Sequence, residues 1–179
     1  MKNDTKPVEP IPLATDRLQL SETSETHLDE LVELANDYEV AVRLARMPFP
    51  YSRSDGIWYL QNIAPACASW SVLASGRFIG IMSLKPEPEL DFLGLGYWLG
   101  RSYWGQGYAT EAGRAIVQYC ASLSNLSHLR SGHYAENRAS GRVLEKLGFR
   151  KVGQHKRDHP LLGKKVEHVD MLLKIGSPG

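Results

Sequence analysis

The stretch that decides the fold is GRSYWGQGYATEAGRAIVQYC, residues 100–120. It places Gly105 and Gly107 on either side of one polar residue, and an amphipathic segment follows directly. Apolar or aromatic side chains at positions 109, 112, 116, 119 and 123 recur at helical spacing, which predicts a helix over residues 107–123. Glycines immediately before a helix are typical of sites where an anion approaches the backbone, because they carry no Cβ atom to obstruct it.

The segments around this stretch alternate between strand and helix patterns. We expect a strand at residues 17–20, three helices between residues 21 and 64, two strands within residues 70–84, and a third strand at residues 93–100. After the central helix come a strand at residues 128–135, a helix at residues 138–147, and strands at residues 149–157 and 164–174. Ala74-Ser75-Gly76 predicts a hairpin turn, and the prolines of MPFPYS, residues 47–52, interrupt the helices. This order predicts one α+β domain on a mostly antiparallel sheet.

Length and composition indicate a globular protein of one domain. The chain has 179 residues, of which 42% are hydrophobic and 23% charged. Residues 1–14 are polar and proline-rich, so we expect a flexible N-terminal arm before a single domain over residues 15–176. The net charge of +1 gives no electrostatic reason to expect a nucleic acid partner. With no signal-peptide pattern, and no apolar run of the roughly 20 residues that cross a bilayer, we expect no membrane partner and a cytoplasmic location.

The cysteines and histidines show no metal-ligand spacing along the chain. Cys67 and Cys120 form no CxxC pair, and both lie among apolar residues, so we expect buried thiols. His155, His159 and His168 lie in the last two strands without the spacing of a ligand motif, so we expect no metal site.

The glycine loop excludes two familiar phosphate motifs. GxxxxGK[ST] occurs nowhere, and the Rossmann fingerprint has Thr110 where its third glycine belongs. The backbone N–H groups from Gly105 to Thr110 can still face one concavity at the start of the helix, and such a site binds pyrophosphate without a lysine. The alternative is a turn that requires flexible residues and binds nothing.

Three segments together resemble a known family. They are TDRLQL (residues 15–20), GYWLGRSYWGQGYATEA (residues 96–112) and ENRASGRVLEKLGF (residues 136–149). In this order and spacing they resemble the GNAT acyltransferases, and within them the RimJ/RimL-like branch that acetylates the N-termini of ribosomal proteins. The resemblance implies a mixed sheet with splayed central strands and flanking helices, acetyl-coenzyme A (acetyl-CoA) as cosubstrate, a primary amine as acceptor, and an arrangement compatible with a homodimer.

The resemblance also implies which residues bind the cofactor. The pyrophosphate would rest on the glycine loop, the pantetheine arm would pair with the central strand, and the start of the following helix would lie beside the thioester. The corresponding positions are Trp104, Gly105, Gln106, Gly107, Tyr108, Ala109 and Thr110 for the loop, Tyr97, Trp98 and Leu99 for the strand, and Asn137 and Ser140 for the helix.

The chain departs from the family pattern at several positions. Ser102 stands where the loop motif has glutamine or arginine, and Arg101 is one residue early, so a direct arginine–phosphate contact is not expected. Gly94 stands where many members have glutamate, and Leu144 stands where a tyrosine often protonates the departing thiolate. Both of the usual acid–base side chains are therefore missing.

Other side chains become candidates for the chemistry. The Ser140 hydroxyl could donate a hydrogen bond to the thiolate, or it could be an ordinary serine in the first turn of a helix that Asn137 caps. His133 has a suitable intrinsic pKa for a general base, but a lone strand histidine is more often structural. Glu136 and Asp91 are further carboxylates that flank the same cleft.

The missing base favours an acceptor amine of low pKa. An α-amine has a pKa near 7.7–8.0 and a lysine amine near 10.4, so obtaining the neutral lysine amine costs about 3.3–3.7 kcal/mol more. We therefore expect an N-acetyltransferase that modifies a protein or peptide N-terminus. Acetylation of a small-molecule amine and a non-catalytic acyl-CoA-binding module remain as alternatives.

Aromatic residues in the first half of the chain have two expected roles. Trp58, Tyr59 and Trp70 are predicted to lie in the core. Phe49 and Tyr51, in MPFPYS, are predicted to lie near the acceptor, because the resemblance places the early helices at that site.

Overall fold

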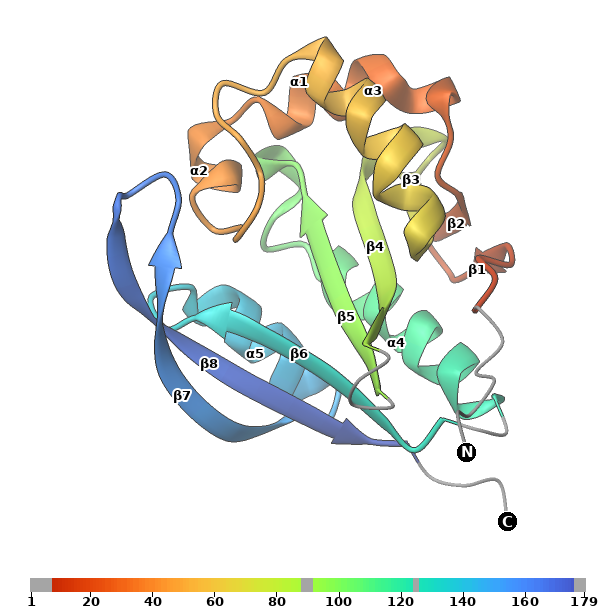
Figure 1. Cartoon of the computed structure of the whole chain (residues 1–179). Helices are drawn as coiled ribbons and strands as arrows, with labels where there is room; N and C mark the ends of the chain where they lie inside the picture. The colour runs from red at the N-terminus through yellow and green to blue at the C-terminus, as the bar shows by residue number, and fades with distance from the viewer. Residues whose placement is uncertain (1–7, 88–91, 124–125, 176–179) are drawn as a thin grey trace.

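The computed structural model describes residues 8–87, 92–123 and 126–175. Its described strands form one eight-stranded sheet in the order β1-β2-β3-β4-β5-β6-β8-β7 (Figure 1). All neighbours are antiparallel except β5 and β6, which are parallel, so the predicted α+β class with a mostly antiparallel mixed sheet is confirmed. The strands are β1 (Leu13–Ala14), β2 (Leu18–Glu22), β3 (Ala68–Ala74), β4 (Arg77–Glu87), β5 (Phe92–Leu99), β6 (His128–Tyr134), β7 (Arg150–His159) and β8 (Lys164–Lys174), and the helices are α1 (Leu28–Ala35), α2 (Tyr38–Ala41), α3 (Arg53–Asn62), α4 (Tyr108–Ala121) and α5 (Arg138–Lys146).

The two central strands separate soon after they meet. β5 pairs with β6 only at Leu93 and Gly94, whereas on its other side it pairs with β4 through Leu99. Figure 1 shows the two strands diverging toward the end of the sheet where α4 begins. The predicted splaying is therefore confirmed, and it leaves the backbone of β5 beyond Gly94 without a strand partner on the β6 side.

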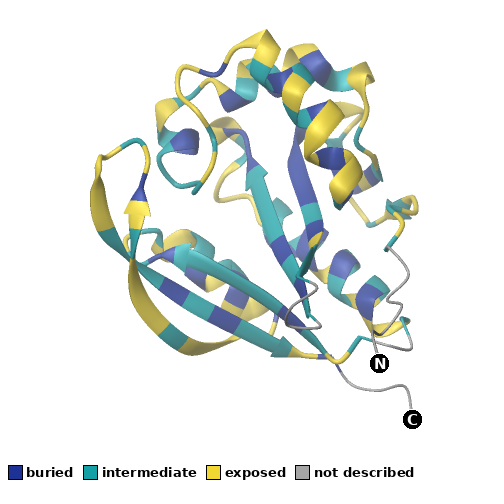
Figure 2. Cartoon of the chain, in the orientation of Figure 1, coloured by how far each residue is buried: buried dark blue, intermediate teal, exposed yellow. Residues whose placement is uncertain are grey.

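Helices cover both faces of the sheet, and neighbouring side chains of β4 pack into the core on opposite faces. Ile79 and Met82 belong to the larger core cluster, which also contains the buried side chains of α4 and α5. Phe78 and Ile81 belong to a second cluster with α1 and α3. In Figure 2 the buried residues run through the middle strands, whereas β7 at the edge is mostly exposed. No helix in the described part of the chain is long and apolar enough to span a membrane.

Local sequence signals fix the ends of several elements. The predicted hairpin turn between β3 and β4 has both Ser75 (φ 49°) and Gly76 (φ 75°) in the left-handed region, as a two-residue hairpin requires. Ser52 begins α3 with a capping box, in which its side chain accepts from the backbone of Asp55 and the Asp55 carboxylate accepts from the backbone of Ser52. Asn137 begins α5 in the predicted way, since its side chain accepts from the Ser140 backbone N–H.

The prediction for the core aromatic residues and thiols holds in part. Trp70 is fully buried, and Tyr59 lies against the second cluster with its hydroxyl 3.0 Å from the Ser69 hydroxyl. Trp58 is 57% exposed, so its predicted place in the core is wrong. It occupies a helix position that faces away from the sheet. Cys120 is buried as expected, whereas Cys67 is half-buried.

The expected flexible arm needs a correction, since residues 8–14 pack onto the domain. β1 pairs with β2, the indole of Trp70 donates to the Ile11 carbonyl at 2.7 Å, and the hydroxyl of Tyr119 donates to the Glu9 carbonyl at 2.9 Å. Buried polar groups require such partners, and here the backbone of a polar, proline-rich segment supplies them. Residues 1–7, and the expected domain end at residue 176, lie outside the described part of the chain.

Candidate functional site

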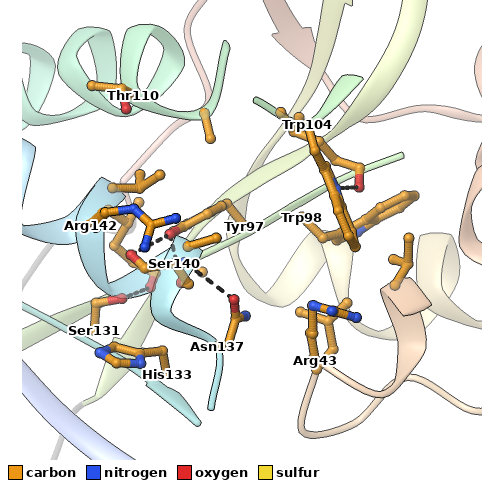
Figure 3. A pocket seen from close by; sticks show the side chains of 18 of the residues that line it. Arg43, Tyr97, Trp98, Trp104, Thr110, Ser131, His133, Asn137, Ser140 and Arg142 are labelled. Atoms are coloured by element: carbon orange, nitrogen blue, oxygen red, sulfur yellow. Dashed lines mark hydrogen bonds between the residues drawn. The ribbon is translucent and has the colours of Figure 1, made fainter. Parts of the chain in front are cut away.

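A cavity of about 460 Å³ lies between the splayed strands β5 and β6. The end of β5, the glycine loop and the start of α4 form one side, and β6 and the start of α5 form the other. His133 and every residue predicted to bind the cofactor line it except Gln106, whose side chain turns back to donate to the Ser102 carbonyl at 2.9 Å. Figure 3 shows Asn137, Ser140 and Tyr97 close together in this cavity, with Trp104 and Arg43 across from them. The structure thus brings together residues that the sequence places in three separate segments.

The glycine loop presents an uncapped helix end to the cavity. Gly107 is the N-cap residue of α4, with φ 81°, and Gly105 has φ 74°, so both occupy the left-handed region that favours glycine. Gly107 offers no side-chain acceptor, and the first N–H groups of an α-helix have no partner within the helix. These groups and the helix dipole together favour an anion at this position.

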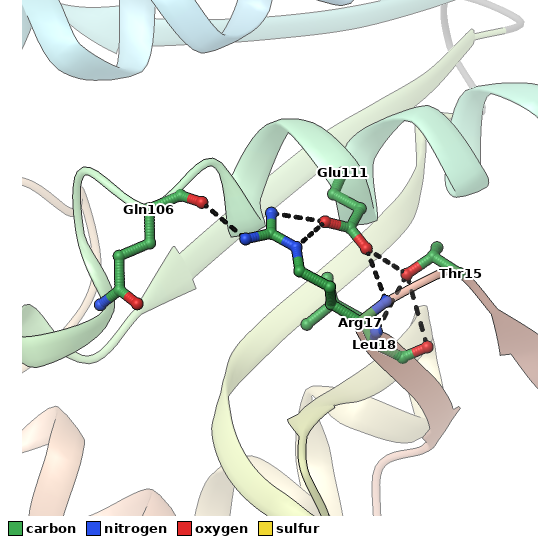
Figure 4. A network of polar contacts seen from close by, with 5 residues as sticks. All are labelled: Thr15, Arg17, Leu18, Gln106 and Glu111. Atoms are coloured by element: carbon green, nitrogen blue, oxygen red, sulfur yellow. Dashed lines mark hydrogen bonds and ion pairs between the residues drawn. The ribbon is translucent and has the colours of Figure 1, made fainter.

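A polar network that the sequence reasoning missed holds the loop from behind (Figure 4). The Arg17 guanidinium donates to the Glu111 carboxylate at 2.7 Å and to the Gln106 carbonyl at 3.1 Å, and it stacks on the Tyr108 ring at 4.5 Å. Thr15 donates to the same carboxylate at 2.6 Å. Thr15 and Arg17 belong to the TDRLQL segment, so the signal was in the sequence, but its partner lies 94 residues away from Arg17.

This network keeps Glu111 charged. Burial acts to raise the pKa of the Glu111 carboxyl, but the hydrogen bonds from Thr15 and Arg17 outweigh it and lower the pKa below its usual value. Arg17 therefore neutralises a carboxylate that would otherwise stand uncompensated in the first turn of α4, next to the N–H groups of the helix start.

Tyr97 of β5 and Ser140 of α5 share a short hydrogen bond across the cavity. Their hydroxyl oxygens lie 2.7 Å apart, and burial raises the pKa of Tyr97 to about 12 against the smaller lowering effect of the Ser140 hydrogen bond. Tyr97 is therefore a neutral hydroxyl at physiological pH. When it donates to Ser140, the Ser140 proton is free to point into the cavity. The sequence placed Tyr97 at the cofactor through its backbone and gave its hydroxyl no role.

Comparison with known proteins identifies the family of the chain. Residues 17–150 match the family model described as an acetyltransferase (GNAT) domain. The chain belongs to the GNAT acetyltransferase family. It is 28% identical over 154 residues to the FsC-acetyl coenzyme A-N(2)-transacetylase of Aspergillus fumigatus, an alignment covering 78% of this chain and 65% of that protein. It is 33% identical over 76 residues to the ribosomal protein uS5 alanine N-acetyltransferase of Escherichia coli, covering 42% of this chain and 39% of that protein.

A solved structure shows the same fold. RimL, a ribosomal α-N-protein acetyltransferase in complex with coenzyme A, superposes with a TM-score of 0.81 at 21% identity, covering 91% of this chain and 97% of that one. The chain spans less than two thirds of the length of the first curated relatives it matches. The predicted family and fold are confirmed.

Within this GNAT domain, Gly94 and Leu144 stand at the positions where the family usually has its acid–base side chains, and neither can transfer a proton. Leu144 is fully buried in the core cluster and cannot meet a thiolate. Gly94 lies where β5 still pairs with β6, and the neighbouring Glu87 carboxylate comes within 3.1 Å of the place where a Cβ atom would be. Arg101 does not line the cavity, in agreement with the expectation that it makes no phosphate contact.

His133 lines the cavity, but its orientation is restricted. Its Nδ1–H donates to the Tyr134 carbonyl at 2.8 Å, so in the neutral ring Nε2 is the unprotonated nitrogen. A Cβ atom at Gly141 would lie 2.9 Å from this Nε2, so the ring packs against the first turns of α5. Its role as a base stays a prediction. Glu136 is exposed and does not line the cavity, and Asp91 lies outside the described residues.

The far end of the cavity is formed by α2 and the residues that follow it. Val40, Arg43, Leu44 and Ala45 line it, and Arg43 lies 5.0 Å from the centre of the Trp104 ring. His159, on β7, is buried, and its Nε2 donates to the Val42 carbonyl at 2.8 Å, which fastens the closing hairpin to this end.

The residues predicted to lie near the acceptor do not reach the cavity. Tyr51 is buried in the second cluster, and Phe49 packs edge-on against Tyr38 outside the cavity. Val40, Arg43, Leu44 and Ala45 line this end of the cavity instead. No apolar periodicity or motif distinguishes them in the sequence.

Proposed function

We propose that this chain transfers the acetyl group of acetyl-CoA to a primary amine, and that the acceptor is the α-amine of a protein or peptide N-terminus. The observation that carries the proposal is the cavity itself, which joins an uncapped glycine-rich helix end to the Tyr97–Ser140 hydroxyl pair along an unpaired strand edge. The names of RimL and of the uS5 alanine enzyme, both acetyltransferases of ribosomal protein N-termini, support the choice of acceptor.

Each wall of the cavity has a role in the proposed reaction. The N–H groups of the α4 start would hold the pyrophosphate. The part of β5 beyond Gly94 that has no strand partner would pair with the pantetheine arm, apart from the Leu95 and Leu99 carbonyls, which accept from the Ser131 hydroxyl and the Trp104 indole. Acetyl-CoA supplies a thioester, which the amine nitrogen attacks directly in a ternary complex. The C–N bond forms, the C–S bond breaks, and the Ser140 hydroxyl, polarised by Tyr97, donates a hydrogen bond to the departing sulfur.

The electrostatic environment favours an amine that is already neutral. Among the described residues that line the cavity, Arg43, Arg142 and Lys146 are cationic, and none is a carboxylate. These charges disfavour a protonated amine, and no carboxylate among these described lining residues is available to accept its proton. An α-amine therefore fits better than a lysine side chain, whose neutral form costs about 3.3–3.7 kcal/mol more.

The test is an assay of free thiol release from acetyl-CoA with three matched acceptors. One is a peptide with a free N-terminus and no lysine. The second is the same peptide with a blocked N-terminus and one lysine, and the third is a set of small amines. We expect release with the first peptide only. Release only with small amines would assign a small-molecule acceptor, and tight acetyl-CoA binding with release no faster than the buffer blank would leave a binding module.

A further inference from the structure

Strands β7 and β8 carry a cluster of three side chains that the linear sequence keeps apart. His155 and His168 are directly paired across the two strands, and Asp170 lies two residues beyond His168, on the same face of the sheet. One potential ligand atom from each residue lies within 4.8 Å of the others. The absence of a ligand motif along the chain therefore does not exclude a metal site, because strand pairing creates the cluster.

Both histidine–aspartate spacings are close to those around a shared ion. The Asp170 carboxylate lies between the two rings, with one oxygen 2.9 Å from His155 Nδ1 and the other 3.5 Å from His168 Nδ1. Two ligands of a tetrahedral ion with metal–ligand bonds of about 2.0–2.2 Å lie about 3.3–3.6 Å apart. The His168 spacing already matches, and the His155 spacing, now a hydrogen bond, needs to open by a few tenths of an ångström.

The cluster also has an unsatisfied atom and room to adjust. His168 Nδ1 is buried and has no hydrogen-bond partner, and a buried polar atom in that state destabilises the fold. Gly153 lies opposite Asp170 at a register shift of β7, and a Cβ atom there would come within 3.1 Å of the carboxylate. The missing side chain leaves the carboxylate free to turn between the two rings.

We propose that His155, His168 and Asp170 form a binding site for one Zn²⁺ ion. Two imidazole nitrogens and one carboxylate oxygen suit zinc, whereas magnesium and calcium require mostly oxygen ligands. His155 is half-exposed, so the fourth position is open to water. The ion would tie β7 to β8 beside the cavity, because His168 is also a cavity-lining residue. The site does not depend on the identity of the acceptor.

The test is a metal titration of the tag-free protein, freed of metal by a chelator. We expect Zn²⁺ to raise the unfolding temperature and to remain bound at one ion per chain after gel filtration, with Mg²⁺ producing neither effect. The variants His155→Ala and Asp170→Asn each remove one ligand and should weaken Zn²⁺ binding at least tenfold. His155 is half-exposed, so its removal tests the site without disturbing the core.

A matched control is present in the same chain. His27 and Glu30 form a histidine–carboxylate pair at 3.8 Å, on a helical segment away from the cluster. The variant His27→Ala should leave the zinc stoichiometry and affinity unchanged. Zinc retention by His155→Ala and Asp170→Asn equal to that of the wild type, or no retained zinc in the wild type, would overturn the proposal.

Discussion

The substitution Gly107→Ala tests whether the start of α4 is the anion site. Gly107 lines the cavity and has φ 81°, and a Cβ atom there would meet only the Arg17 guanidinium, at 3.5 Å. The methyl group therefore fits without a clash in the folded protein. Gly76, in the hairpin turn between β3 and β4, has φ 75° and nothing within 4 Å of its Cβ position, and it lies outside the cavity. Gly76→Ala is thus a matched control for the backbone cost alone.

The two variants should lose similar stability and differ in cofactor affinity. An L-residue in the left-handed region costs roughly 1–2 kcal/mol, and each kcal/mol lowers the unfolding temperature by about 2–4 °C in a chain of this size. At Gly107 the methyl group also stands against the Arg17 guanidinium that holds the loop, so we expect it to shift the N–H groups that would contact pyrophosphate. A hydrogen bond to a charged group contributes about 1.5–3 kcal/mol, so its loss weakens binding by about 10- to 100-fold.

Calorimetric titration with acetyl-CoA and thermal unfolding of both variants measure these quantities. We expect the unfolding temperatures to fall together, while only Gly107→Ala loses affinity. If Gly107→Ala bound acetyl-CoA as tightly as Gly76→Ala and the wild type, the cofactor would not rest on this helix end. The assignment of the glycine loop would then be wrong.

Three further predictions concern individual side chains. Tyr97→Phe removes the partner of Ser140, so kcat should fall about tenfold while acetyl-CoA affinity stays unchanged in titration; an unaltered kcat would exclude the hydroxyl pair from the chemistry. Because the pKa of Glu111 is lowered in the folded state, its contribution to stability is fully present above its unfolded pKa and is lost as the pH falls through the folded value. Lowering the pH from 5 to 3 should therefore reduce the unfolding temperature of the wild type more than that of Glu111→Gln. Equal pH dependence of the two unfolding temperatures would contradict the network. Burial raises the pKa of Cys120 to about 12, so this thiol should resist alkylation at neutral pH until the protein unfolds, as mass spectrometry of the labelled peptide would show.

The sequence predicts the fold well because its signals are local. The helical period of residues 107–123, the turn at Ser75-Gly76 and the cap at Asn137 are each complete within a few residues, and the structure confirms all three. The site residues of the glycine loop and β5 are likewise read from one continuous segment. The prediction that Trp58 lies in the core is wrong because α3 has apolar residues around much of its surface. Periodicity alone therefore does not decide which of them faces the sheet.

The features that the sequence does not reveal all depend on tertiary pairing. Arg17 meets Glu111 only because β2 passes behind the first turn of α4, and Tyr97 meets Ser140 only because β5 faces α5 across the cavity. The His155, His168 and Asp170 cluster requires the exact register of β7 on β8. In each case no local sequence pattern distinguishes the residues within their own segments.

The described lining residues include no carboxylate, which restricts how the amine can lose its proton. The Nδ1–H of His133 is engaged by the Tyr134 carbonyl, and its Nε2 lies against α5, so this ring can accept a proton only at an atom packed beside Gly141. A direct transfer therefore requires the ring to move, whereas transfer to water requires no such movement. Proton loss to water is far easier for an amine whose pKa is near 8 than for one near 10.4. If His133→Ala retained full turnover on a free N-terminal peptide, water would be the base; loss of turnover together with a changed pH dependence of kcat would assign the role to His133.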